Sequence, residues 1–73
     1  MNAQKAMLEL SRQYEGFEEG DEVRLCNFFR WLSEYVNPTA TINHVQLEAV
    51  KQDVIEDNFD LLSIATYINT CHE

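Results

Sequence analysis

The strongest apolar pattern in this sequence is EVRLCNFFRWLSEYV, residues Glu22 to Val36. Its apolar side chains recur three or four residues apart, which is the spacing of a helix with one buried face. One continuous stripe is formed by Leu25, Phe28 or Phe29, Leu32 and Val36. The pattern therefore predicts a central helix. Asn37-Pro38 ends it, because the residue before a proline is pushed away from helical geometry.

A second helix is predicted on the amino-terminal side, over residues 3–15. Gly16 can adopt the left-handed conformation that closes a helix, and Phe17 is placed for the apolar contact that often accompanies such an ending. Asp21 is expected to cap the central helix. The buried face of the helix over residues 3–15 is expected to consist of Ala3, Ala6, Met7, Leu10 and Tyr14.

On the carboxyl-terminal side, Asn43 and Gln46 form the signature of a capping box, with Ile42 and Leu47 as the flanking apolar pair. A third helix is therefore predicted to begin after Asn43. Its buried face is expected to consist of Leu47, Val50, Val54 and Ile55.

Asp57-Asn58 is expected to interrupt this helix, and Phe59-Asp60 to open a fourth one as another apolar staple and cap. The residues after Asp60 are also compatible with a strand, because several are β-branched or aromatic. A helix is preferred, since a lone strand would have no partner. The apolar residues at helical spacing in this segment are Leu61, Ile64, Ala65, Ile68 and Cys71.

Length and composition agree with these patterns. A chain of 73 residues has room for one domain, residues 1–73, and a domain of this size buries only about 60% of its unfolded surface. Two glycines and one proline favour long helices over many turns. The sequence thus predicts an all-α, single-domain bundle of three to four helices.

The charge of the chain limits its partners. Thirteen acidic side chains against five basic ones give a formal net charge of -8. Binding to nucleic acid or to anionic lipid depends on Lys and Arg, so direct binding to either is not expected. A basic protein surface is the expected partner, because complementary charge speeds encounter and sets orientation.

The sequence also bears on location. No apolar run approaches the roughly 20 residues that a membrane helix needs. Residues 1–5 lack the apolar core of a signal peptide. Cys26 and Cys71 are far apart in the chain, and two cysteines in a protein without such a signal are most often reduced. A cytoplasmic protein is predicted.

Two clusters of carboxylates stand out. The first surrounds the loop after the first helix and is predicted to bind the partner, because it combines charge with an apolar ring and two glycines. Its predicted partner-binding residues are Glu15, Phe17, Glu18, Glu19, Asp21 and Glu22. The second cluster consists of Asp53, Glu56, Asp57 and Asp60. The alternative is that both clusters are simply solvated.

Chemistry at a metal or an active site is not expected. The acidic spacing from Glu15 to Glu22 does not match an EF-hand. The possible zinc ligands lack any paired spacing, and they are Cys26, His44, Cys71 and His72. No nucleophile elbow, phosphate-binding glycine loop or His-Glu metal pair occurs. Neither enzymatic activity nor a cofactor is predicted.

The central helix is rich in aromatic residues, namely Phe28, Phe29, Trp31 and Tyr35. Most of this run is expected in the core. The apolar arc is wider than one neighbour needs, so one of Phe29, Trp31 or Tyr35 is expected to stay partly exposed. Such a ring could face a partner or a second copy of the chain. A monomer is expected, because each copy carries the same net charge of -8.

The opening MNAQKAML, residues 1–8, together with the chain length, resembles small acidic transcription regulators of lytic Xanthomonas bacteriophages. This resemblance implies binding to the β′ subunit of host RNA polymerase. It also implies displacement of the σ factor, inhibited initiation and read-through of terminators. No diagnostic motif supports it, so it transfers no functional residue. The alternative is an acidic anti-CRISPR or anti-restriction protein that blocks a nucleic-acid-binding groove.

Overall fold

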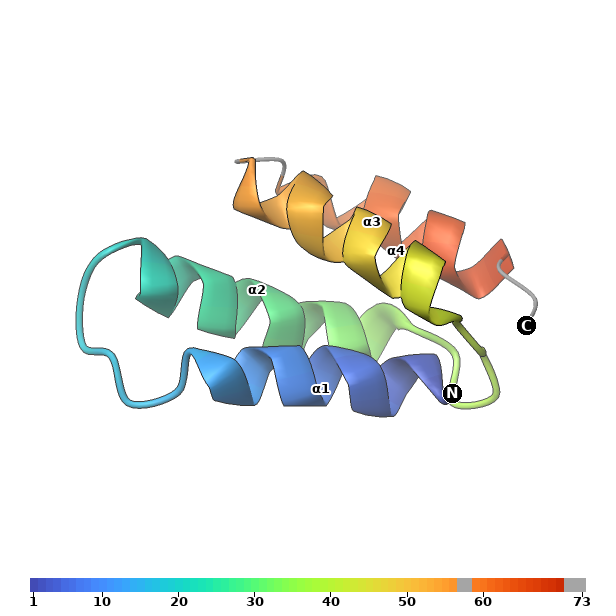
Figure 1. Ribbon diagram of the computed structural model, residues 1–73, viewed down its shortest axis with the longest axis horizontal. Coiled ribbons are helices and arrows are strands. Elements are labelled where there is room, and N and C mark those ends of the chain that lie inside the picture. The colour runs from blue at the N-terminus through green and yellow to red at the C-terminus, as the bar shows by residue number, and fades with distance from the viewer. Residues whose placement is uncertain (57–58, 71–73) are drawn as a thin grey trace.

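The computed structural model describes residues 1–56 and 59–70, and within these residues the chain forms four helices (Figure 1). They are α1 (Ala3–Gln13), α2 (Asp21–Tyr35), α3 (His44–Ile55) and α4 (Leu61–Thr70). The described residues form no strand beyond one isolated bridge between Asn2 and Thr41. The predicted all-α bundle is therefore confirmed.

In Figure 1, α1 and α2 run antiparallel to each other, and so do α3 and α4. The first pair is closely packed along its length, and α4 contacts α2. Phe29 lies at the centre and is fully buried. Its ring stacks on Tyr14 of the turn after α1 at 6.2 Å and meets Phe28 edge-on at 6.4 Å. The pattern that predicted the central helix thus also supplies the centre of the core.

The core draws on all four helices and on the segment between α2 and α3. Three of its residues come from that segment: Val36, Ala40 and Ile42. Five of the larger core side chains come from α1 and α2: Met7, Leu10, Phe28, Phe29 and Leu32. The second pair of helices contributes Val50, Val54, Ile64, Ala65 and Ile68. The predicted apolar stripe of the central helix is therefore confirmed, with Leu25 only partly buried.

Two helix boundaries differ from those predicted. The first helix ends at Gln13 with Tyr14 as its carboxyl-terminal cap, two residues before the predicted end. Asp21 is the first residue of α2, whose cap is Gly20, so the prediction of Asp21 as the cap is wrong. Its carboxylate lies in the first turn, where it interacts favourably with the positive end of the helix dipole.

The capping box of α3 is confirmed. The Gln46 N–H donates to Asn43 Oδ1 at 2.8 Å, and the Asn43 N–H donates to Gln46 Oε1 at 3.0 Å. Ile42 is fully buried and Leu47 is partly buried against the core. The prediction that Ile55 is buried is wrong, because it is 45% exposed at the last turn of the helix.

The fourth predicted element is a helix, and the strand alternative is wrong. The Ser63 N–H donates to Asp60 Oδ1 at 3.3 Å, so Asp60 caps α4 as predicted. Phe59 packs against the core and meets the Phe28 ring edge-on at 5.2 Å. The predictions for Asp57-Asn58, and for Cys71 and His72, lie outside the described residues.

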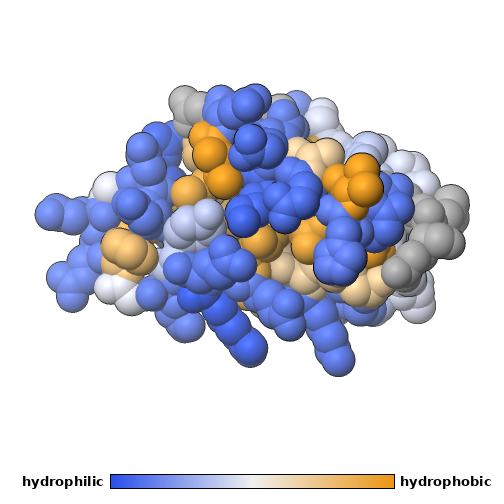
Figure 2. Space-filling model, in the orientation of Figure 1, coloured by the Kyte–Doolittle hydropathy of each residue, from blue (hydrophilic) through white to orange (hydrophobic). Residues whose placement is uncertain are grey.

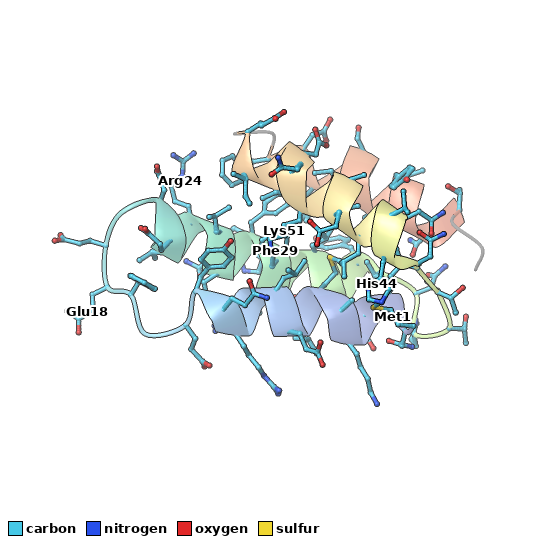
Figure 3. The ribbon with its side chains drawn as sticks, in the orientation of Figure 1. Met1, Glu18, Arg24, Phe29, His44 and Lys51 are labelled. Atoms are coloured by element: carbon cyan, nitrogen blue, oxygen red, sulfur yellow. The ribbon has the colours of Figure 1, made fainter. Side chains whose placement is uncertain are left out.

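Backbone hydrogen bonds join the amino terminus to the segment before α3, a contact that the sequence did not predict. The Met1 amine donates to the Ile42 carbonyl at 3.1 Å, and the Ile42 N–H donates to the Met1 carbonyl at 2.9 Å. The Ala3 N–H donates to the Ala40 carbonyl at 2.9 Å. These bonds place the start of α1 beside the start of α3, where Met1 and His44 are labelled in Figure 3.

Candidate protein-interaction site

The turn between α1 and α2 brings together all six predicted partner-binding residues. Five of them are exposed, and Glu22, in the first turn of α2, is half-buried. Glu18 projects from this turn away from the helices (Figure 3). Phe17 is 54% exposed, so the apolar contact predicted to close α1 leaves more than half of the side chain in solvent. Figure 2 shows this end of the molecule as largely hydrophilic around one apolar patch.

The two glycines of the turn allow the chain to reverse direction. Gly16 has φ of 97° and Gly20 has φ of 94°, a region that residues with a side chain rarely adopt. A Cβ added to Gly20 would also lie 3.2 Å from Glu22 Oε2. The positive φ predicted for Gly16 is therefore confirmed, and Phe17, Glu18 and Glu19 lie on the short segment between the two glycines.

Little in the described part of the chain neutralises this turn. Arg24 Nη1 lies 3.7 Å from Asp21 Oδ1 in an ion pair whose two side chains are largely exposed. An exposed pair of this kind contributes about 0–1 kcal/mol. Within residues 1–56 and 59–70, no side-chain hydrogen bond or ion pair holds Glu15, Glu18 or Glu19. Their charges therefore face solvent.

The structure brings the second acidic cluster to the same end of the molecule. A shallow groove of about 280 Å³ is lined by Asp21 and Leu25 of α2 on one side and by Val54 and Phe59 on the other. Asp53, Glu56 and Asp60 flank the α3 to α4 connection, and Asp57 lies outside the described residues. The two clusters, separate in sequence, therefore lie at one end of the bundle, and Arg24 of α2 also lines the groove between them.

The aromatic run of α2 divides between core and surface. Phe28 and Phe29 are buried, whereas Trp31 is 55% and Tyr35 54% exposed. The sequence predicted one partly exposed ring, and two are found. A groove of about 380 Å³ between α2 and the start of α4 is lined by Arg24, Asn27, Phe28, Trp31, Phe59 and Leu61. The Arg24 guanidinium lies 4.7 Å from the Phe59 ring centre.

Cys26 is buried and accepts a hydrogen bond from Arg30 Nη2 at 3.7 Å. The described ranges contain no group of three His, Cys, Asp or Glu side chains placed to hold a metal ion. Among the helices of residues 1–56 and 59–70, none has the length and apolar character needed to cross a membrane.

Asp60 has a pKa below its ordinary value, because the Ser63 hydroxyl donates to Oδ2 at 2.7 Å and the Ser63 N–H donates to Oδ1. This contact stabilises the folded chain above the ordinary pKa of aspartate and is lost as the pH falls through the lower, folded value. We expect Ser63→Ala to raise the Asp60 pKa, measured by carbon-13 NMR of its carboxyl group. An unchanged titration midpoint would contradict this assignment.

A third groove, of about 520 Å³, lies between α3 and α4. The sequence did not predict this groove, because it forms between two helices and neither helix alone has a pattern of polar or apolar residues that indicates it. The available signals were Tyr67, an aromatic residue on the solvent side of α4, and Ala49, which shares a face of α3 with Asp53.

Comparisons with known proteins add no further assignment: no protein-family model, no curated protein sequence and no solved structure matches this chain.

Proposed function

We propose that this chain is a binding protein that docks on host bacterial RNA polymerase and changes transcription without chemistry of its own. The observation that carries the proposal is the α1–α2 turn, where exposed carboxylates surround the half-exposed Phe17. Five acidic residues and no basic residue occur between Glu15 and Glu22. Such a surface fits a basic protein surface that also offers an apolar contact.

The two components of the turn have different roles in this proposal. Charge mainly sets the approach and orientation of the partner, whereas buried aromatic area usually holds a complex together. Phe17 is the side chain available to be buried on contact, and the second cluster places further carboxylates at that end of the bundle. The chain acts as a monomer in this proposal, because a second copy carries the same charge.

The identity of the partner comes from the resemblance of residues 1–8 to phage transcription regulators. On this basis the docking surface is the β′ subunit, near basic surface by the RNA exit region. Binding there would displace the σ factor, inhibit initiation and permit read-through of terminators, all in the cytoplasm of the host bacterium. Direct contact with nucleic acid or with a membrane is not part of the proposal.

A pull-down from bacterial lysate tests the proposal, with the tagged chain on the resin at moderate salt. We expect polymerase subunits in the eluate. Adding the purified chain to purified polymerase should then lower σ-dependent initiation and raise terminator read-through. Recovery of another protein with no polymerase subunit would end the proposal, and a nuclease or CRISPR complex in the eluate would favour the groove-blocking alternative.

A further inference from the structure

The groove between α3 and α4 has an apolar floor and an acidic end. Its lining residues are Ala49, Val50, Gln52, Asp53, Glu56, Ser63, Ile64 and Tyr67. Val50 and Ile64 are buried at its base, and Tyr67 is 45% exposed at its edge. The groove has about 520 Å³ of volume, which is within the range of pockets that bind ligands.

The charges around the groove are of one sign. Asp53 and Glu56 line it, and Asp60 is hydrogen-bonded to a third lining residue, Ser63, at 2.7 Å. None of the lining residues is Lys or Arg. The nearest basic residue in the α3 sequence, Lys51, is two positions before Asp53, about 200° around the helix, and therefore faces away.

The end of α3 adds to this negative field. The last turn of α3 contains no basic residue, so no side chain of that turn complements the negative end of its helix dipole. The opposing positive end of α4 is already capped by Asp60. A cation is therefore favoured beside Glu56, whereas the part of the groove near Ala49 and Tyr67 favours an apolar side chain.

The length of the groove limits what it can hold. From Ala49 to Glu56, α3 rises about 10 Å, which equals roughly three residues of an extended chain. Side chains two residues apart point to the same face of an extended segment and are separated by about 7 Å. A basic and an apolar side chain at that spacing would reach the acidic end and the apolar part together.

We propose that the α3–α4 groove is a docking site for an extended peptide segment of another protein that presents a basic and an apolar residue at positions i and i+2. The aliphatic stem of the basic side chain packs on the groove while its charge reaches Asp53 and Glu56. This inference goes beyond the proposed function, because it concerns the groove between α3 and α4 rather than the α1–α2 turn, and it does not depend on RNA polymerase being the partner.

The probe for the test is a nine-residue peptide, Gly-Lys-Ser-Leu-Ser-Lys-Ser-Leu-Gly, titrated into the labelled full chain and followed by nitrogen-15 NMR. We expect shift changes confined to residues 49–56 and 63–67. A second peptide with both leucines changed to serine carries the same charge, and we expect it to bind at least fivefold more weakly.

Matched variants separate the groove from general attraction to an acidic protein. We expect Asp53→Asn with Glu56→Gln to weaken binding of the leucine peptide at least fivefold. Glu18→Gln with Glu19→Gln changes the net charge by the same amount and should alter the affinity less than twofold. Circular dichroism confirms that both variants remain folded.

Three results would overturn the proposal: equal weakening by the two pairs of substitutions, equal affinity of the two peptides, or shift changes centred on the α1–α2 turn. None of these results bears on polymerase capture, so failure here and failure of the proposed function are distinguishable. Conversely, groove binding could hold even if no polymerase subunit were recovered.

Discussion

Replacing Phe29 by alanine is expected to remove about 3–5 kcal/mol of folding free energy. The side chain is fully buried and contacts Tyr14 and Phe28, so its removal leaves a cavity where α1 and α2 meet. A chain of 73 residues has a total stability of about 4–11 kcal/mol. The substitution should therefore remove a large fraction of the stability, measured as the urea midpoint by far-ultraviolet circular dichroism.

Trp31→Ala is the matched control, since it removes a large aromatic side chain two residues further along the same helix. Trp31 is 55% exposed, so we expect a loss of less than about 1 kcal/mol. Equal destabilisation by the two substitutions would contradict the assignment of Phe29 to the core and of Trp31 to the surface.

The second large effect concerns binding. Glu18→Lys with Glu19→Lys should weaken binding to the polymerase partner at least tenfold, about 1.4 kcal/mol. Both side chains are exposed, and neither forms a side-chain hydrogen bond or ion pair within residues 1–56 and 59–70. The fold should therefore survive, while the field that orients a basic surface is reversed. Calorimetry with the purified partner measures the loss, and circular dichroism checks the fold.

Asp53→Lys with Glu56→Lys provides the comparison for this experiment, since it changes the net charge equally. We expect it to weaken polymerase binding less, because the exposed turn combines its charge with Phe17, whereas Phe59 beside the second cluster packs on the core. If the second pair proves the more damaging, the α1–α2 turn is not the main contact surface.

Much of the fold could be predicted because its signals are local. The apolar spacing of residues 22–36 identifies α2, and the positions of Asn43 and Gln46 identify the start of α3. These signals depend on the geometry of one helix and the few residues beside it. The grouping of carboxylates, Phe17 and two glycines at the α1–α2 turn could be predicted for the same reason, since these residues are close together in the chain.

The errors lie where a neighbouring element decides the outcome. The helical spacing placed both Val54 and Ile55 on a buried face, but only Val54 is fully buried, and Ile55 is 45% exposed. Trp31 and Tyr35 share a helix with the fully buried Phe29, and both remain more than half exposed because the packed neighbours cover only part of the wide apolar arc. The residues after Asp60 were correctly predicted as a helix, although their composition also suits a strand.

The sequence by itself determined the helical class, the central helix, the cap of α3 and the negative charge of the first turn, since each depends on neighbouring residues or on composition alone. Only the tertiary structure decided that the two acidic clusters meet at one end, that the amino terminus bonds to the segment before α3, and that a groove with an acidic end separates α3 from α4. These features join residues distant in the chain, and their proximity follows from how the helices share one small core.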